Sequence, residues 1–400
     1  MLCSLKGAGN WNNFSKIKPT INIVTIISNI STPVKTIETF KLVRLLMLFM
    51  GGVIEKLGIV STLKKKKVCI VHHNDADGIC SAAILAITMK RLGNFPIKII
   101  SPKFTEFDDE ITKELEEIKP EFIVVLDMSL NTLRNLKDLH ENYLVIDHHP
   151  FDGAKDSRVI HSTKNCASYL TFEFCSKFSR INDISWIAGI GCLADKDING
   201  FRKLRDLIYE NYPELNDNLM KVMMCFVSSS RVFGQKGLFY GVNALIEAAE
   251  MQSPTAILGS TPNSQKLLKL RKFSIAQRNY WLLRFNEIAD FDEESKSIFL
   301  KINSKFFIQN YLAGTISNLY PNHTCFVINE GLDEKYAIIE ARTKNNGINL
   351  GKIMNDICSH FEDCSGGGHK QAAGAKVPKI SMNKFIDSLK LSMRRVRLGQ

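Results

Sequence analysis

The sequence predicts an α/β protein in which a parallel-sheet lobe is joined by a helical connector to a smaller α/β C-terminal lobe. Short apolar segments alternate with segments of helical length in the first part of the chain, and the short ones are apolar at almost every position. Strands of that kind are buried on both faces, which is typical of parallel sheets. A break rich in Pro, Ser, Gly and Thr at 253–263, followed by a long charged segment, predicts the connector.

Four strand-like segments define the predicted parallel sheet, namely VCIVHH (68–73), IKIISP (97–102), FIVVLD (122–127) and YLVIDHH (143–149). The segments between them have helical length, at 79–92, at 108–118 and over roughly 131–140. Strands that alternate with helices are joined by right-handed crossovers, which gives a sheet of parallel strands. Further buried helices are expected over 165–180, 184–192 and 203–250.

The second half of the chain has a different pattern. A charged helix is expected over 264–290, and the strand-like segments SIFLKI, FVINE and YAIIEART follow it. We therefore divide the chain into an N-terminal segment of unknown role (1–64), the parallel-sheet lobe (65–250), the connector (251–295) and the second lobe (296–400).

Composition and charge exclude some simple interpretations. A chain of 400 residues with 45% hydrophobic and 23% charged residues resembles an ordinary soluble protein with two or three cores. The net charge of +11 is uneven, because residues 1–67 carry +9 and residues 376–400 carry +6, which leaves the body at −4. The ten cysteines include no CxxC pair, and Cys358 and Cys364 have poor spacing for zinc. We expect reduced thiols in a cytoplasmic protein, and no basic nucleic-acid cleft is indicated by charge alone.

The first 64 residues contain no motif that indicates chemistry. Their apolar stretch 42–60 is interrupted by charged residues and a Gly pair, and its uninterrupted length is too short for a membrane-spanning helix. A genuine appendage is one interpretation, and a true start at Met47 or Met50 is another. A helix lying on a membrane surface is a third. We expect no membrane partner.

The sequence HHNDADG places three ionisable side chains directly after the first strand-like segment. His73, Asp75 and Asp77 alternate along the chain, so a loop that leaves a strand would point them the same way. Like charges so close together repel each other unless a cation lies between them. Gly78 would then release the backbone into a helix whose N-terminus faces a phosphate. The alternative is a polar turn in which an Asp caps the helix.

Two further strand-like segments also end in ligand-type residues. Asp127 ends FIVVLD, and Asp147, His148 and His149 end YLVIDHH. Asp127 alone is more typical of a helix cap or a loop than of a metal ligand. An acid followed by two imidazoles is an unusual cluster to leave without a partner. Polar groups at the carboxyl ends of neighbouring strands form the active sites of open α/β sheets.

A downstream acid completes the pattern. Asp195 in LADKD is the candidate, with Asp197 as the alternative, and either could cap a helix instead. Carboxylates and imidazoles together suit Mn²⁺ or Mg²⁺ better than a metal that prefers thiolates. Two adjacent divalent ions chiefly serve phosphoryl transfer. The residues therefore predict a two-metal hydrolase.

The order of these motifs resembles that of a known family. HxDxDG, a lone Asp, DHH and a downstream Asp, followed by SGGGHKQAAGA, are similar to the DHH phosphoesterase superfamily with its associated C-terminal domain. The context of the first motif is most similar to the archaeal RecJ-like exonucleases. The resemblance implies that His73 and Asp75 hold one Mn²⁺, that Asp77, His148 and Asp195 hold a second, and that Asp127 bridges both. It also implies that Asp147 orients the imidazoles and that His149 faces the scissile phosphate.

The second lobe carries candidate substrate-binding residues. Gly366, Gly367 and Gly368 would let a backbone approach a phosphate or a base closely, and His369 adds a hydrogen-bond donor. Arg342, at the end of YAIIEAR, could grip a phosphate with two N–H groups. The alternative is a glycine-rich hinge and a structural arginine.

The resemblance implies a metal-dependent exonuclease that hydrolyses single-stranded DNA or RNA from an end to nucleoside 5′-monophosphates. We expect two Mn²⁺ ions, with Mg²⁺ as a substitute, and replication or repair proteins as candidate partners. One alternative is an enzyme acting on short oligoribonucleotides, on pAp or on a cyclic dinucleotide. A non-catalytic replisome scaffold and an inorganic pyrophosphatase are others.

Overall fold

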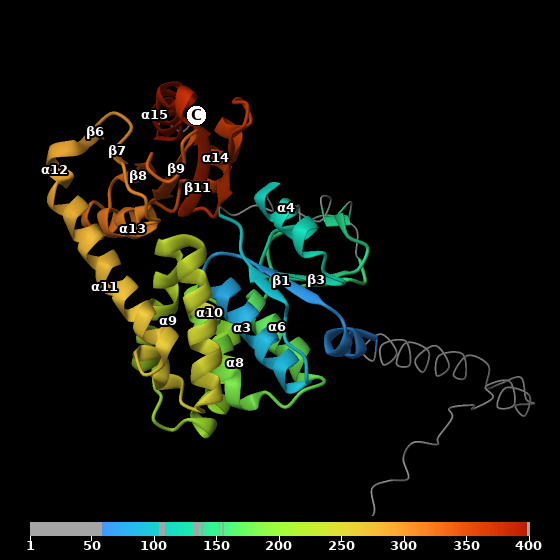
Figure 1. Ribbon diagram of the computed structural model, residues 1–400. Helices are drawn as coiled ribbons and strands as arrows, with labels where there is room; N and C mark the ends of the chain where they lie inside the picture. Colours follow the sequence, from blue (N-terminus) through green and yellow to red (C-terminus); the bar gives the residue numbers. More distant parts are fainter. Residues whose placement is uncertain are drawn as a thin grey trace, which may run out of the picture. The chain divides into compact units, whose positions relative to one another are not determined.

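Five short strands form a parallel sheet in the computed structural model, in the order β2–β1–β3–β4–β5 (Figure 1). Their bounds are Val68–His72 (β1), Lys98–Ile100 (β2), Phe122–Leu126 (β3), Tyr143–Asp147 (β4) and Val159–His161 (β5). Every residue of β1 and β4 is buried, as expected of strands that are covered on both faces. The parallel sheet predicted from the apolar segments is therefore present, and β5 extends it by a strand that the sequence did not predict.

Helices cover both faces of this sheet. The structure describes residues 58–103, 109–130, 136–137, 139–151, 153 and 156–397. Figure 1 shows α3 (Ala76–Arg91) and α6 (Ala167–Ser176) on one side of the sheet and α4 (Asp109–Ile118) on the other. Ile111 and Leu115 of α4 pack on the alternate side chains of the strands that face them. The expectations for residues 1–64 and for a helix over 131–140 lie largely outside the described residues.

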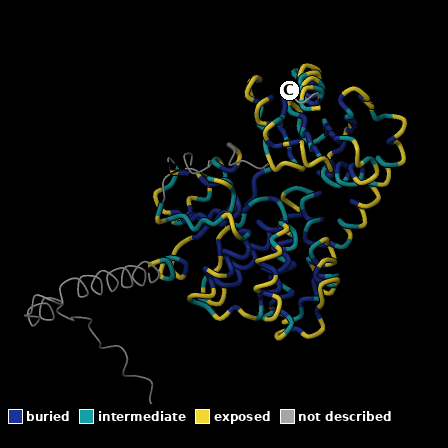
Figure 2. Tube along the Cα trace, turned by 180° about the vertical axis from the view of Figure 1, so that it is seen from behind, coloured by how far each residue is buried: buried dark blue, intermediate teal, exposed yellow. Residues whose placement is uncertain are grey.

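The helical region expected over 203–250 is divided into three helices. They are α8 (Ile198–Asn211), α9 (Asp217–Ser228) and α10 (Gly234–Glu250), and they follow the buried helix α7 (Ser185–Ala194). Asn216 starts α9 by accepting hydrogen bonds from the N–H groups of Asn218 and Leu219. A 3₁₀ turn, η4 (Ser229–Phe233), leads into α10. Many residues of α7 and α10 are buried, and Figure 2 draws buried residues in dark blue.

The connector is a single long helix, α11 (Pro262–Leu283). It begins in a capping box, because Thr261 and Ser264 each bond the backbone N–H of the other. The 3₁₀ turn η5 (Pro254–Leu258) precedes it, and the short helix α12 (Phe285–Ile288) follows it. The Pro-rich break and the charged helix predicted from the sequence are thus both present, with the helix ending at Leu283 instead of 290.

The second lobe is built on a six-stranded mixed sheet in the order β10–β11–β9–β8–β7–β6. The strands are β6 (Ala289–Asp292), β7 (Ser297–Ile302), β8 (Thr324–Asn329), β9 (Tyr336–Arg342), β10 (Ser365–Gly368) and β11 (Ala372–Pro378). Its helices are α13 (Gln309–Leu319), α14 (Leu350–Cys358) and α15 (Met382–Arg397). Only β7 and β8 run parallel among these pairs. The α/β fold class predicted from the sequence is confirmed.

A group of aromatic rings joins η4, the connector and the second lobe. Phe233, Phe273 and Phe306 form a mutual contact, with ring centroids 5.0–5.5 Å apart. The N–H of Phe307 also donates to the carbonyl oxygen of Val232 at 3.1 Å. No helix in the described part of the chain has the length and the apolar character needed to cross a membrane.

Candidate active site

The carboxyl ends of three neighbouring strands bring ligand-type residues together. His73 follows β1, Asp127 follows β3, and Asp147 is the last residue of β4, with His148 and His149 after it. Because β1, β3 and β4 are parallel neighbours, these residues meet at one edge of the sheet.

The start of α3 differs from the sequence-based expectation. The helix begins at Ala76 instead of 79, so Asp77 and Gly78 lie in its first turn. Asp75 is the N-cap, and its Oδ1 accepts from the N–H of Gly78 at 3.0 Å. A Cβ atom on Gly78 would lie 2.3 Å from the carbonyl oxygen of His73. The glycine thus does not release the chain into the helix. It lets the helix start directly against the strand exit.

The first set of candidate ligands consists of His73, Asp75 and Asp127, whose ligand atoms lie within 4.8 Å of one another. Nδ1 of His73 lies 3.0 Å from Oδ2 of Asp75 and 3.5 Å from Oδ2 of Asp127. This geometry leaves the three side chains facing one common point.

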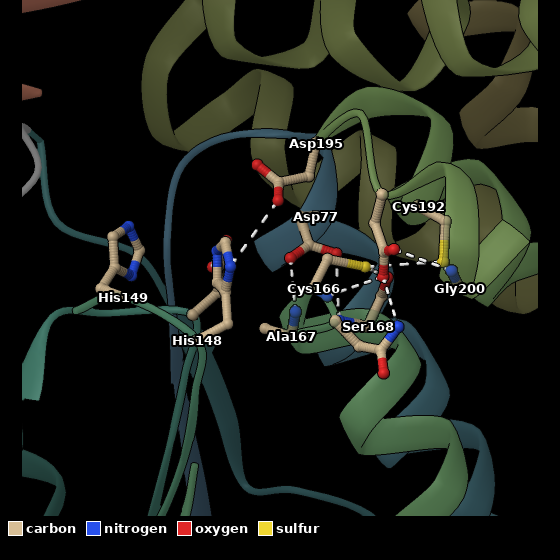
Figure 3. Close-up of polar contacts among 12 residues, drawn as sticks. Asp77, His148, His149, Cys166, Ala167, Ser168, Cys192, Asp195 and Gly200 are labelled. Carbon is tan, nitrogen blue, oxygen red and sulfur yellow. Dashed lines mark hydrogen bonds and ion pairs between the residues drawn. The ribbon is translucent and has the colours of Figure 1, made fainter. Parts of the chain in front are cut away.

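The second set consists of Asp77, His148 and Asp195, again with ligand atoms within 4.8 Å of one another. Figure 3 shows His148 beside Asp77 and Asp195, which both lie on the same side of its ring, and Nδ1 of His148 is 3.7 Å from Oδ2 of Asp195. The start of α6 holds the carboxylate of Asp77 in place. This carboxylate accepts hydrogen bonds from the N–H groups of Ala167 at 2.7 Å and Ser168 at 3.0 Å.

Asp127 connects the two sets. Its Oδ1 lies 3.2 Å from Nε2 of His148, while its Oδ2 faces His73. The side chain is almost completely buried, and the residue has a φ of +61°, in the left-handed region that non-glycine residues rarely adopt. Such a conformation persists only where the surroundings hold it, and it is most common at functional sites.

The geometry separates Asp195 from its alternative, Asp197. Asp197 caps α8 by accepting from the N–H of Gly200 at 2.7 Å, and its other oxygen accepts from the N–H of Cys166 at 3.0 Å. Lys196 between them has a φ of +61°, which turns the two carboxylates apart. Asp195 therefore faces His148, whereas Asp197 has a structural role at the start of a helix.

The electrostatics of both sets indicate excess negative charge. Burial, and then the neighbouring carboxylates of Asp127 and Asp195, raise the pKa of Asp77 to about 8. Burial lowers the pKa of His148, but hydrogen bonding and charge from Asp127 outweigh it and raise that pKa to about 10. The pKa of His73 is raised to about 10 in the same way, by Asp75 and Asp127 against the effect of burial. In the absence of metal, protons on Asp77, His148 and His73 therefore balance the negative charge of the carboxylates, which bound cations would otherwise balance.

Unpartnered atoms provide a test of whether a metal fits. Within the described residues, Oδ2 of Asp147 is buried without a hydrogen-bond partner, and both carboxylate oxygens of Asp127 and Nδ1 of His73 are buried with only their ion-pair contacts to one another and to neighbouring side chains. Buried polar atoms without partners are destabilising, and a divalent cation would satisfy the lone pairs of Asp127 and His73. The donor set, of carboxylates and imidazoles, suits Mn²⁺ or Mg²⁺.

His149 shares a third group of possible ligand atoms with Asp127 and His148, and one of its ring nitrogens is held by Asp147. Its Nδ1 is 2.7 Å from Oδ1 of the fully buried Asp147. Burial lowers the pKa of His149, but the hydrogen bond and the charge of Asp147 outweigh it, so the pKa is raised. The ring centroids of His148 and His149 are 4.7 Å apart. The remaining ring nitrogen of His149 is therefore available to a ligand at the site.

Comparison with known proteins explains this arrangement. A model of the N-terminal domain of the DHH family matches residues 67–194, and a DHHA1 domain model matches residues 309–394, together more than half of the chain. The chain belongs to the DHH family. It is therefore a phosphoesterase of that family, with the ligand sets inside or directly beside the region matched by the first model.

Solved structures of RecJ share the DHH fold with this chain. Exonuclease RecJ bound to manganese matches with a TM-score of 0.62 at 16% identity, covering 85% of this chain and 94% of that one. RecJ from Thermus thermophilus in complex with Mn²⁺ matches with a TM-score of 0.65 at 17% identity, covering 85% of this chain and 54% of that one. The chain thus spans about half the length of the Thermus protein. A search of curated protein sequences found no match.

The DHHA1 domain contains the predicted glycine-rich segment as an edge strand. Gly366, Gly367 and Gly368 lie in β10, which pairs antiparallel with β11, so the alternative of a hinge is wrong. A Cβ atom on Gly367 would meet nothing within 4 Å, whereas Gly368 has a φ of +132° and would place a Cβ atom 2.6 Å from the carbonyl oxygen of Ala372. Gly367 therefore leaves open space beside the strand, and Gly368 allows the backbone to turn towards His369.

His369 and Arg342 of the DHHA1 domain have different surroundings. Partial loss of hydration, and then the positive charges of His149 and His148, lower the pKa of His369. His369 is thus within electrostatic reach of the imidazoles of the DHH domain. Arg342 forms an ion pair with Glu340 and donates to Oδ1 of Asn310 at 2.6 Å. Glu340 lies two residues before Arg342 in β9, so both side chains lie on the same face of the strand. Neither partner of Arg342 was anticipated from the sequence.

Proposed function

We propose that this DHH-family phosphoesterase is a metal-dependent exonuclease. It hydrolyses single-stranded nucleic acid from an end and releases nucleoside 5′-monophosphates. The observation that carries this proposal is the position of Asp127, whose two oxygens face two separate ligand sets. A carboxylate shared by two sets is what a pair of divalent ions requires.

Each ligand set has the donors for one ion. His73, Asp75 and Asp127 would hold one Mn²⁺, and Asp77, His148 and Asp195 would hold the other, with Mg²⁺ as a substitute. When bound, two such ions make a water molecule nucleophilic at neutral pH and stabilise charge on the entering and leaving oxygens of a phosphoryl group. The backbone N–H groups of Ala167 and Ser168 in α6 orient the carboxylate of Asp77 in the second ligand set.

His149 would act on the phosphate that is cleaved. Because Asp147 binds Nδ1, the Nε2–H group of His149 is left to donate to a phosphate oxygen. The raised pKa keeps the imidazole protonated at a pH where a free histidine loses its proton. A fixed, charged donor stabilises the charge that develops on phosphate during displacement.

A cluster of arginines supports a polyanionic substrate. Arg231 of η4 and Arg271 and Arg278 of α11 all act on the hydroxyl of Tyr311 in α13, where they oppose the effect of burial on its pKa. Burial raises the pKa of Asp75, but His73, the N–H of Gly78 and then the charge of Arg231 outweigh it and lower that pKa. The arginines lie on η4 and α11, and the aromatic group of Phe233, Phe273 and Phe306 joins these two segments to the one before α13. Arg231, Arg271 and Arg278 are here called the arginine cluster.

The arginine cluster lacks carboxylate partners. Among the described residues, none of its three arginines forms an ion pair, and the Nε atoms of Arg231 and Arg278 are buried without a hydrogen-bond partner. A half-buried guanidinium group without a carboxylate partner favours an anion, and the phosphates of a nucleic acid strand would provide one. Sequence analysis missed these residues, because isolated arginines on a helix and a short turn show no motif.

The test is an assay of purified protein with Mn²⁺ on DNA and RNA labelled at either end, in lengths from a dinucleotide to about a 20-mer. We expect mononucleotide products to appear first from one end, with no internal cleavage. Asp127→Asn serves as the matched inactive control. Internal cleavage, or hydrolysis of pyrophosphate alone, would contradict the proposal and favour another chemistry on the same metal pair.

A preference for very short strands is the second candidate. The charges of His149 and His148 contribute to the lowered pKa of His369, which supports placing the group that would contact the end of the strand near the site of cleavage. A dinucleotide would then occupy all of the binding site. A rate that falls steadily with length would favour this candidate, and a rate that rises to a plateau would favour the exonuclease.

A further inference from the structure

Two cysteines of the DHHA1 domain lie unusually close together. Cys358 is the last residue of α14, and Cys364 directly precedes β10. Their Sγ atoms are 2.8 Å apart, compared with 3.5 Å for the buried pair Cys166 and Cys192. An S–S bond is about 2.05 Å long, so the sulfur atoms need to approach by less than about 1 Å.

The pair lies against the glycine-rich strand. A Cβ atom on Gly366 would be 2.7 Å from Sγ of Cys358, so the thiol packs directly on the backbone of β10. At the other end of α14, a Cβ atom on Gly351 would be 2.1 Å from the carbonyl oxygen of Gly368. The N–H of Gly351 donates to the carbonyl oxygen of His369 at 3.1 Å. Helix α14 therefore runs along β10 and contacts it at both ends.

The two thiols differ in accessibility. Cys358 is buried at 4% exposure, whereas Cys364 is half-buried. The hydrogen bond with Cys358 lowers the pKa of the Cys364 thiol against the opposing effect of burial. A partly exposed thiol with a lowered pKa is the one that attacks an oxidant, and a buried neighbour is the one that resolves the product.

We propose that Cys358 and Cys364 are a redox modification site, which forms a disulfide with a low-molecular-weight disulfide such as glutathione disulfide as the oxidant. The Cys364 thiolate attacks one sulfur of the oxidant, forms a mixed disulfide and releases one glutathione thiolate. Cys358 then loses its proton to solvent and attacks the Cys364 sulfur, releasing the second glutathione. Two protein thiols are oxidised by two electrons, and one glutathione disulfide is reduced to two thiols.

The new bond acts on the substrate-binding edge of the domain. Closing the gap between the sulfur atoms moves the end of α14 against Gly366, and β10 leads directly to His369. We expect the oxidised protein to capture substrate less well, with a raised KM, and to bind metal as before. This consequence rests on the proposed function, whereas formation of the disulfide does not.

Peptide mass measurement tests the bond without any activity assay. The full-length protein is incubated with excess glutathione disulfide, alkylated under denaturing conditions and digested with trypsin. Residues 353–370 form one tryptic peptide that contains both Cys358 and Cys364 and no other cysteine. We expect this peptide to lose the mass of two hydrogens and to escape alkylation. A peptide that carries two alkyl groups after oxidation would overturn the proposal.

Three variants make the test specific. In Cys358→Ser we expect a glutathione adduct to persist on Cys364, and its absence there would overturn the assignment of the attacking thiol. Cys225→Ser removes an exposed cysteine and should leave disulfide formation unchanged. In Cys364→Ser we expect KM to be insensitive to oxidant. If the wild type forms the bond but shows no nuclease activity, the proposed function fails and the redox site stands.

Discussion

Oδ1 of Asp147 lies 2.7 Å from Nδ1 of His149, and Asp147 is completely buried. A buried carboxylate opposite an imidazole fixes both the orientation of the ring and its proton. Asp147 itself belongs to neither of the ligand sets around His73 and His148. We therefore expect Asp147 to orient His149 and to fix its proton without binding a metal ion itself.

Asp147→Asn tests this expectation. The amide keeps the size of the side chain but removes the charge that stabilises protonated His149. We expect kcat to fall by about 10–100-fold, which is the usual effect of removing a group that orients a site histidine. Mn²⁺ affinity, measured by calorimetry, should be unchanged. Asp183→Asn, which removes a surface ion pair with Arg91, is the matched control and should keep full activity. Loss of Mn²⁺ binding in Asp147→Asn would place Asp147 among the metal ligands.

Asp127→Ala should abolish hydrolysis without unfolding the protein. Asp127 faces both ligand sets, so its removal disrupts both proposed ions together. Loss of one acid from a repulsive metal-free cluster should have little effect on folding, which circular dichroism would check. Activity above about a tenth of the wild-type value would contradict the bridging role, because loss of two-metal catalysis reduces rates by several powers of ten.

Asp195→Ala and Asp197→Ala should have opposite effects. Asp195→Ala removes a proposed ligand beside His148, so we expect weaker Mn²⁺ binding and an unchanged melting temperature in EDTA. Asp197→Ala removes the cap of α8, which should reduce the free energy of unfolding by about 0.5–2 kcal/mol. Mn²⁺ affinity should then be retained. The reverse result in calorimetry and thermal unfolding would reassign the ligand to Asp197.

Mn²⁺ should raise the melting temperature, and EDTA should remove activity. An ion that binds only the folded state stabilises it by mass action. The folded metal-free protein keeps a proton on Asp77 up to about pH 8, whereas the unfolded chain loses it near pH 4. Mn²⁺ has to displace that proton, so the gain in melting temperature should increase from about pH 6 to pH 8. A gain that falls over this range, or full activity after chelation, would contradict the two-metal site.

His369→Ala and Arg342→Ala should weaken substrate capture more than metal binding. Each removes one hydrogen-bonding partner of a charged substrate, with a loss of about 1.5–3 kcal/mol, or roughly ten- to a hundred-fold in KM. Arg342→Lys keeps the charge but not the paired N–H groups, so it should recover little. Mn²⁺ affinity should be unchanged in all three variants. A variant that loses metal but binds oligonucleotide normally would assign its residue to the metal site.

The sequence was sufficient to predict the sheet and the gathering of most candidate ligands at one edge of it, because the relevant signals are local. Apolar runs ending in Asp127 and in Asp147 predict buried parallel strands, and parallel strands necessarily gather their carboxyl ends. The start of α3 was placed too late because a metal ligand and a helix cap were treated as alternatives in this turn. In the structure its Oδ1 caps the helix, while its Oδ2 faces His73.

Other features depend on contacts that no local pattern reveals. The segment around Gly366 has low strand propensity, and only pairing with β11 makes it a strand. The anchoring of Asp77 uses backbone N–H groups of Ala167 and Ser168, about ninety residues away, which carry no sequence signal. The arginine cluster forms only where η4 and α11 meet, beside Tyr311 of α13. These three features depend on how segments distant in the sequence pack together, so they could not be predicted from local sequence patterns.

The left-handed backbone of Asp127 has an evolutionary consequence. A non-glycine residue in this region is destabilised by about 1–3 kcal/mol, and a glycine there would relieve much of that. Mutation towards glycine would thus be favoured by thermostability and opposed by activity. A chain that served only as a structural scaffold would be free to accept the more stable residue. If Asp127 bridges the two proposed ions, this position therefore exchanges folding stability for activity.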